Sequence, residues 1–132
     1  MLFRSALGIN FQLAKDHAEA LLNVQSDRAD AFALDDVLLY SFKATSRTPD
    51  SYEVVGEALQ VEPYACMVRK NDPKFKELVD GVIVGMMKSG QFAQNYQRWF
   101  MQAIPPHNVT LGFPMGDMLK ENIQNPTDKP MR

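Results

Sequence analysis

The chain has 132 residues, of which 45% are hydrophobic and 23% charged, an ordinary composition for one globular domain. Its 14 basic and 16 acidic residues give a formal net charge of -2, so the sequence indicates no clustered basic surface for nucleic acid. No apolar run reaches the roughly 18 residues that a membrane-spanning helix needs. The single cysteine, Cys66, excludes an internal disulfide and any cysteine-built metal site.

The first half of the chain alternates predicted strands and helices. Strand-like apolar runs occur at 7–13, 31–34 and 52–56. The first predicted helix spans about Asp16 to Gln25, with Asp16 as its cap and Glu19 in the capping-box position. A second predicted helix runs from about Asp36 to Ala44.

The second half begins near Val61 with another strand-like run, Pro63 to Lys70, in which Cys66 is expected to be buried and inert. Asp72 and Pro73 then predict a helix start, with the acid as cap and the proline at the first helical position. This helix has the most regular apolar spacing in the sequence, and Ser89-Gly90 ends it.

A shorter helix is predicted over 91–100, followed by an irregular tail with a short helix at about 116–124. One face of the shorter helix is aromatic, which predicts a core contact rather than a platform for a ligand. Its residues are Phe92, Tyr96, Trp99 and Phe100.

The segment RADAFALDD, Arg28 to Asp36, carries the clearest functional signal. Its apolar run ends at Asp35 and Asp36, where a helix begins, so Asp35 is expected at the carboxyl edge of a sheet. Ligands bind at that edge in open α/β sheets, and a carboxylate there can receive an ammonium group. The alternative is that Asp35 and Asp36 only stabilise the start of the helix.

Four stretches of the sequence resemble a known family in their order. They are KDHAEALLNVQSDRADAFALDDVLL, YACMVRKNDPKFKELVD, MKSGQFAQNYQRWF and AIPPHNVTL. They resemble the C-terminal part of periplasmic solute-binding proteins of amino-acid ABC transporters, in the glutamate/aspartate-binding branch, over about Leu7 to Arg132. The resemblance implies an α/β fold, namely a truncated type II periplasmic-binding-protein-like fold with a short mixed sheet, flanking helices and an irregular C-terminal tail.

The resemblance also implies two parts that form one compact unit. Residues 1–60 would be a remnant of lobe two, and residues 61–132 the crossing strand, C-terminal helices and tail of lobe one. The family's first half lies outside the resemblance, so helix faces that would cover a lobe-one sheet are expected to be uncovered. Uncovered faces predict a rearranged compact fold or a homodimer, formed for instance by swapping at a linker near Leu59 to Pro63.

Two residues receive ligand-binding roles from the resemblance. Asp35 matches the position whose carboxylate holds the α-ammonium of the amino acid. His17 matches a position near the ligand's side-chain carboxylate, and an exposed histidine in a helix's first turn is an equal alternative. Asp36 is expected to be a first-turn acid. The groups that hold the α-carboxylate in the family lie largely outside the resembling part, so at most weak glutamate or aspartate binding is expected.

The remaining functional expectations follow from the same resemblance. An ABC permease is the implied partner, no cofactor or metal is implied, and the implied location is the periplasm. The start, MLFRSALGINF, has no signal-peptide pattern, so a complete gene product would be cytoplasmic. No enzyme is expected, because the sequence contains no nucleophile–base pair, phosphate loop or metal-spaced histidine cluster. The alternative function is a structural or protein-interaction remnant that binds no ligand.

Overall fold

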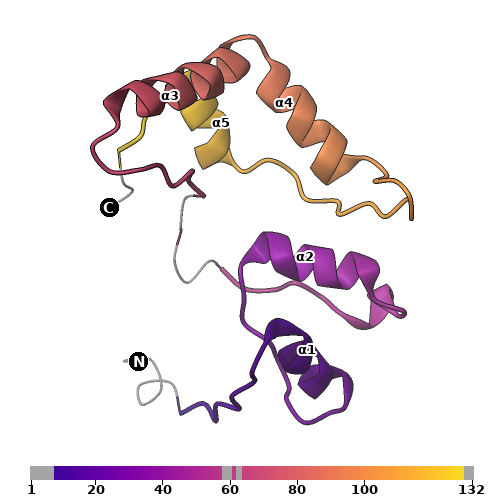
Figure 1. Cartoon of the computed structure of the whole chain (residues 1–132). Coiled ribbons are helices and arrows are strands. Elements are labelled where there is room, and N and C mark those ends of the chain that lie inside the picture. The colour runs from indigo at the N-terminus through magenta and orange to yellow at the C-terminus, as the bar shows by residue number, and fades with distance from the viewer. Residues whose placement is uncertain (1–7, 58–60, 62–63, 130–132) are drawn as a thin grey trace. The chain divides into compact units, whose positions relative to one another are not determined.

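The computed structural model describes residues 8–57, 61 and 64–129, and over these residues the regular structure is helical (Figure 1). The α-helices are α1 (His17–Gln25), α2 (Asp36–Thr45), α3 (Pro73–Lys88), α4 (Gln91–Tyr96) and α5 (Asp117–Gln124), with a 3-10 turn at Pro49–Ser51 and a π-helical turn at Gln97–Met101. The chain falls into two compact units that divide between Asp35 and Asp36.

Helix α1 begins where the capping pattern predicts. The Asp16 carboxylate accepts a hydrogen bond from the Glu19 amide at 2.8 Å, which satisfies one of the free N–H groups of the first turn. The Glu19 carboxylate in turn accepts from the Lys15 amide at 2.8 Å. The predicted cap is therefore confirmed. In a capping box the Glu19 side chain would bond to the amide of the cap residue itself, but here it bonds to the amide of Lys15, the residue before the cap.

A tight turn after α1 leads the chain into the 30–35 segment. Asp27 has φ of 55°, a left-handed conformation that aspartate tolerates better than most residues. The Asn23 carbonyl accepts from the amides of Arg28 and Ala29 at 2.8 and 3.1 Å. Asn23 is also the only residue classed as buried in the described part of the chain, at 5% exposure. The turn is thus organised around Asn23.

Helix α3 also begins and ends as its sequence predicts. The Asp72 carboxylate accepts from the Phe75 amide at 3.1 Å, and Pro73 occupies the first turn, where its missing N–H costs nothing. Ser89 forms the C-cap, and Gly90 turns the chain with φ of 79°, which glycine adopts without strain. Helix α4 and the π-helical turn then continue to Met101, which confirms the predicted helix over 91–100.

Four rings form an aromatic cluster in the second unit: Tyr40, Tyr96, Phe100 and Phe113. Tyr96 stacks on Phe100 with ring centroids 4.4 Å apart, and Phe113 lies 5.2 Å from Tyr40 and 6.2 Å from Phe100. The Phe113 amide donates to the Phe100 carbonyl at 3.1 Å. The cluster therefore joins α2, α4, the π-helical turn and the segment before α5.

The aromatic face predicted as core has two kinds of members. Tyr96 and Phe100 belong to the aromatic cluster, as expected. Trp99 is 48% exposed and carries the Arg98 guanidinium 5.4 Å from its ring centroid. A cation over an exposed indole is a weak surface interaction. Phe92, Tyr96 and Phe100 are half-buried rather than fully buried, and the prediction of a core role is wrong for Trp99.

The short mixed sheet expected from the sequence is not confirmed. The described residues contain no strand, only one antiparallel bridge between Ile104 and Val109, and the runs at 8–13, 31–34, 52–55 and 64–69 form neither strand nor helix. Alternating apolar residues define a face, but a strand also needs a neighbouring segment to receive its backbone hydrogen bonds. No described segment fills that role. Leu7 and most of the Leu59 to Pro63 linker lie outside the described residues.

Large apolar side chains remain accessible in both units. No hydrophobic residue is classed as buried in the described ranges. Cys66, expected to be buried in a strand, is exposed, because the run that carries it has no ladder partner among the described residues. No helix within those ranges has the length and apolar character to cross a membrane.

Candidate functional site

Asp35 lies at the junction that the sequence predicts, immediately before the first residue of α2. Its side chain is exposed. In the preceding segment the exposure alternates, with Phe32 and Leu34 half-buried and Ala31 and Ala33 exposed. The segment therefore keeps the two-residue period of a strand although no strand is formed. Asp35 therefore follows a segment with a strand-like pattern of exposure and precedes a helix. Within the described residues it does not lie at the edge of a sheet.

His17 is the first residue of α1 and is also exposed. Its imidazole lies 6.4 Å from the Phe32 ring, centroid to centroid, in a tilted arrangement. Phe32 precedes Asp35 by three residues, a backbone span of at most about 11 Å. The structure therefore brings His17 to the same short segment that carries Asp35. Phe32 was not predicted from the sequence as a neighbour of His17. Its place in the apolar run at 31–34, just before Asp35, was the sequence feature that could have indicated it.

Asp36 stands in the first turn of α2, as the sequence predicts. Its carboxylate accepts a hydrogen bond from the Val37 amide at 2.7 Å. A negative charge at a helix N-terminus is stabilised by the free N–H groups and the helix dipole. Asp36 therefore has a local structural role at the start of α2.

The charge of Asp36 also acts on the aromatic cluster. Partial burial of the Tyr96 hydroxyl raises its pKa above 10.0, and the negative charge of Asp36 raises it further. Both effects favour the neutral phenol. Tyr96 is thus a neutral packing residue near neutral pH, not a source of charge for a ligand.

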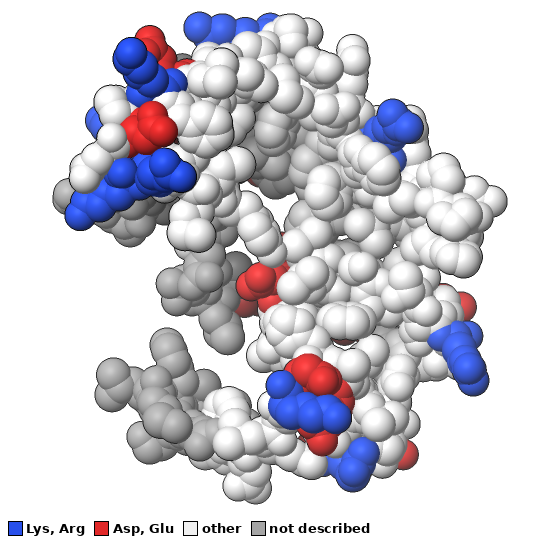
Figure 2. Space-filling view, viewed as in Figure 1, with Lys and Arg blue, Asp and Glu red and all other residues white. Residues whose placement is uncertain are grey.

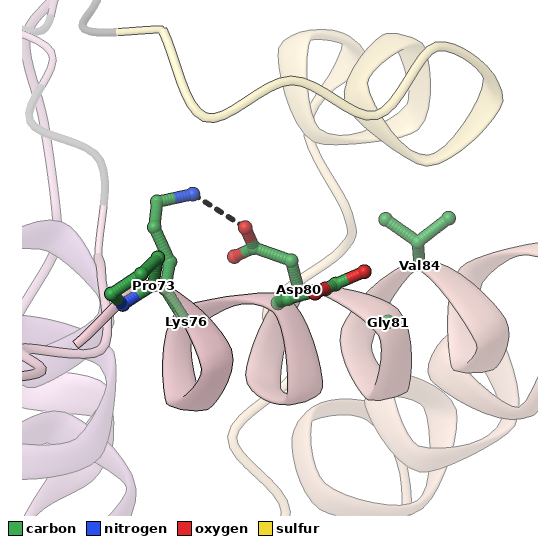
Figure 3. A pocket seen from close by; sticks show the side chains of 6 residues that line it. Pro73, Lys76, Asp80, Gly81 and Val84 are labelled. Carbon is green, nitrogen blue, oxygen red and sulfur yellow. Dashed lines mark hydrogen bonds and ion pairs between the residues drawn. The ribbon is translucent and has the colours of Figure 1, made fainter.

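A shallow groove of about 490 Å³ lies along α3, and the sequence did not indicate it. Its lining residues are Pro73, Lys76, Glu77, Asp80, Gly81 and Val84. Figure 3 shows Lys76, Asp80 and Val84 on the side of α3 that is turned toward the C-terminal segment. The Lys76 ammonium donates to both Asp80 and Asp128. This cation is already matched by two carboxylates, so the groove offers no free positive charge to an anion.

Charges of both signs are scattered over the face of the molecule seen in Figure 2. In Figure 2, acidic and basic side chains form small mixed groups between uncharged residues on the face that is shown. The described residues also contain no cluster of three or more His, Cys, Asp or Glu side chains with metal-site geometry. The candidate ligand-binding residues are therefore still His17 and Asp35, in the first unit.

Comparison with known proteins gives relatives over most of the chain. The L-glutamate/L-aspartate-binding protein of Pseudomonas aeruginosa is 45% identical over 123 residues, which are 93% of this chain and 41% of that protein. The glutamate/aspartate import solute-binding proteins of Salmonella typhimurium and Escherichia coli are 39% and 40% identical over 93% and 88% of this chain, and 41% and 38% of their own lengths. No family model matches the sequence.

The relatives are much longer than the matched region. This chain spans about two fifths of the length of each of them. Identity of this level over nearly the whole chain means common descent, and the relatives are binding proteins of import systems, not enzymes. The matched residues include all of α3, since a stretch of 123 residues in a chain of 132 cannot leave out its centre.

Proposed function

We propose that this chain, a homologue of part of the glutamate/aspartate-binding solute-binding proteins, contributes one side of an amino-acid-binding site in an import system. The observation that carries the proposal is the 45% identity to a glutamate/aspartate-binding protein over 93% of the chain. The proposed ligands are L-glutamate and L-aspartate, and the proposed partner is the permease of an ABC importer. The proposed location is the periplasm.

Asp35 is proposed to receive the α-ammonium of the amino acid. Its support is chemical and positional: it is an exposed carboxylate at the end of the 31–34 run, and it precedes α2 directly. A carboxylate accepting from an ammonium makes a charge-assisted hydrogen bond, which is about twice as strong as a neutral one. Asp36 keeps its place as the first-turn acid of α2, where its carboxylate accepts from the Val37 amide.

His17 is proposed to lie near the side-chain carboxylate of the ligand. Its ring contacts Phe32, which belongs to the segment that leads to Asp35. An imidazole N–H donates to a carboxylate in its neutral form and more strongly in its protonated form.

The described residues support only weak binding by this chain alone. An exposed ion pair contributes about 0–1 kcal/mol, whereas micromolar affinity needs roughly 8 kcal/mol. Two exposed side chains therefore fall far short of tight binding. We expect a dissociation constant of about 1 mM or weaker, which corresponds to about 4 kcal/mol or less.

The proposal is tested by titrating the chain with L-glutamate and L-aspartate while following backbone amide shifts by NMR. Saturating shifts are expected at the start of α1 and around Asp35. Glutarate, which has the two carboxylates of glutamate but no ammonium, should produce little change. Asp35→Asn should remove the response to glutamate, whereas the matched control Asp30→Asn, an exposed acid in the same segment, should retain it.

Two outcomes would contradict this assignment. Equal responses to glutamate and glutarate would mean that no group recognises the ammonium. Loss of binding in both Asp30→Asn and Asp35→Asn would mean that general negative charge, not the position of Asp35, is responsible. Absence of any shift at ligand concentrations of tens of millimolar, well above the expected constant of about 1 mM, would remove amino-acid binding by the isolated chain.

A second candidate function is a protein-interaction module that binds no amino acid. The observation that favours it is the exposure of Phe75, Leu78 and Val82, which follow one line along α3. Exposed apolar faces of this kind mark contact surfaces. A saturable protein partner that is unaffected by glutamate and aspartate would favour this function over the first.

A further inference from the structure

The turn after α1 is a Schellman motif whose left-handed residue is an aspartate. The Arg28 amide donates to the Asn23 carbonyl at 2.8 Å, and the Asp27 amide donates to the Val24 carbonyl at 3.2 Å. These two backbone bonds define the motif, with Ser26 as the C-cap. The left-handed position is usually glycine, but in this chain it is Asp27, with φ of 55°. The turn therefore carries a conformational cost that a glycine turn would not have.

Two side chains add a chain of hydrogen bonds to this turn. The Ser26 hydroxyl donates to the Leu22 carbonyl at 2.7 Å and accepts from the Arg28 Nε–H at 2.9 Å. The hydroxyl thus acts as donor and acceptor at once, and hydrogen bonds linked in this way strengthen each other. The side chain of Arg28, like its amide, is held at the end of α1. These contacts offset part of the cost of the left-handed Asp27.

The turn also determines which residue of the 30–35 segment reaches the start of α1. The Asn23 carbonyl accepts from the Ala29 amide at 3.1 Å, so the segment leaves the helix at the level of Asn23. The helix rises about 9 Å between Asn23 and His17. An extended chain covers about 10 Å between Ala29 and Phe32. The two lengths match, and the ring centroids of His17 and Phe32 lie 6.4 Å apart.

A change in this turn would displace the segment that carries Asp35 relative to α1. Phe32 and Leu34 are half-buried, while Ala31 and Ala33 are exposed. Because side chains alternate along an extended segment, a shift by one residue would turn an alanine toward α1 in place of Phe32. It would also move Asp35 by about 3.3 Å. A hydrogen bond tolerates only a few tenths of an ångström around about 2.9 Å, so a shift of this size would remove a ligand contact.

We propose that Ser26 and Arg28 are positioning residues for the site of His17 and Asp35. Their hydrogen bonds hold the left-handed turn at Asp27 and so fix the register in which the 30–35 segment returns along α1. Arg28 follows the end of α1 that lies about 12 Å from His17, so its role is exerted through the turn and not by its charge on the ligand. The inference rests on the proposed function for the identity of the ligand, whereas the contact of His17 with Phe32 reports the register without any ligand.

The test measures the full chain by NMR, with the nuclear Overhauser effect between the His17 and Phe32 rings as the readout of register. Ser26→Ala and Arg28→Met should each weaken this effect. Each should also speed hydrogen exchange at the Ala29 amide about two- to tenfold, which is what one hydrogen bond corresponds to. The double variant should be no worse than Ser26→Ala alone, because Ser26→Ala already removes the bond that Arg28→Met removes.

The same variants are then titrated with L-glutamate. The response of the amides around Asp35 should weaken in Ser26→Ala and Arg28→Met together with the ring contact. Ser26→Thr keeps a hydroxyl and should behave as the parent chain. Arg47→Met, which removes an exposed arginine outside the turn, should change neither the ring contact nor the response to glutamate.

Substitution of Asp27 separates positioning from an effect of charge. Asp27→Gly adopts the left-handed conformation without strain, so it should restore the ring contact and the glutamate response when it is added to Ser26→Ala or Arg28→Met. Asp27→Ala removes the same negative charge but disfavours the left-handed conformation, so it should restore neither. Restoration by both substitutions would mean that the net charge of the turn, and not its conformation, is responsible.

The combined results decide between the possible roles. A ring contact and a glutamate response that are lost together, and that Asp27→Gly but not Asp27→Ala restores, support the inference. An unchanged ring contact in Ser26→Ala and Arg28→Met overturns it, and so does loss of the α1 helix itself in Arg28→Met, because the role would then be in folding. A parent chain that does not respond to glutamate sinks the proposed function alone, since the ring contact still tests the role of the turn. A glutamate response in variants without the ring contact sinks the inference alone.

Discussion

The Lys76 ammonium donates a hydrogen bond to the Asp128 carboxylate at 2.8 Å, a contact between residues that are 52 positions apart. It also donates to Asp80 one turn along α3. These bonds raise the pKa of Lys76, Asp128 being the larger cause and Asp80 the next. The hydrogen bond from Lys76 lowers the pKa of Asp128 below 3.8. One exposed lysine therefore links the first turn of α3 to the segment after α5.

Asp128→Asn should release the C-terminal segment from α3 without changing the helicity of the chain. The bond lies at the surface, so its loss affects the local segment more than global stability. We expect faster hydrogen exchange at the amides of Thr127 and Lys129. The control Asp117→Asn removes an exposed acid whose partner, Lys120, is in the same helix, and it should leave these amides unchanged. Unchanged exchange in Asp128→Asn would contradict a tethering role.

Acid should reproduce the effect of Asp128→Asn. The pKa of Asp128 is lower in the folded chain than in the unfolded chain. The contact of its carboxylate with Lys76 therefore stabilises the folded segment above the unfolded pKa near 3.8, and this stabilisation is lost as the pH falls through the lower folded value. Exchange at Thr127 and Lys129 should therefore rise, relative to the intrinsic rate, only when the pH falls below about 4. Salt should weaken the same contact, because exposed charges are screened.

Asp72→Ala should fray the start of α3. The Asp72 carboxylate satisfies the Phe75 amide, and loss of an N-cap costs about 1 kcal/mol of helix stability. The expected result is an approximately fivefold faster exchange at Phe75, which is what about 1 kcal/mol corresponds to. Asp72→Asn is the matched control, because asparagine caps about as well as aspartate. Equal effects of both variants would mean that charge, not capping, holds this helix end.

The helices could be predicted from sequence because their determinants are local. Asp16 with Glu19, and Asp72 with Pro73, fix helix starts within one turn, and both caps form as expected. The predicted sheet, by contrast, is not confirmed in the described residues. The run at 31–34 keeps its alternating exposure, but a strand depends on a distant partner that alternation does not encode.

The site was predictable only in part for the same reason. The position of Asp35 before α2 follows from local pattern, and so does the place of Asp36 in the first turn. The contact of His17 with Phe32 depends on the turn around Asn23, which brings α1 back beside the segment. The Lys76–Asp128 contact and the pairing of Tyr40 with Phe113 join distant positions, and no spacing in the sequence marks them.

Tyr40→Leu should loosen the aromatic cluster. The Tyr40 ring lies 5.2 Å from Phe113, and an aromatic pair contributes about 0.5–1.5 kcal/mol beyond the area that it buries. The amide of Phe113 is a direct reporter, because it donates to Phe100. Its exchange should become about five times faster for a loss near 1 kcal/mol. The control Tyr52→Leu, outside the cluster, should leave the exchange rate of this amide unchanged. A slower or unaltered exchange rate of the Phe113 amide in Tyr40→Leu would contradict the packing role of Tyr40.

Asp36→Asn should lower the pKa of Tyr96 without returning it to 10.0. Burial is the larger cause of the raised pKa and the Asp36 charge the smaller one, so removing the charge leaves the burial effect in place. NMR titration of the Tyr96 ring measures this directly, with Asp117→Asn as a control at another acid.

The raised pKa of Tyr96 also makes the stability of the folded chain depend on pH. Because the pKa is raised on folding, the contribution of Tyr96 to stability is complete below the unfolded value near 10.0 and is lost as the pH rises through the folded value. The aromatic cluster should therefore open at alkaline pH, and it should open at a lower pH in Asp36→Asn. A Tyr96 that titrates at or below 10.0 in the parent chain would contradict the burial of its hydroxyl.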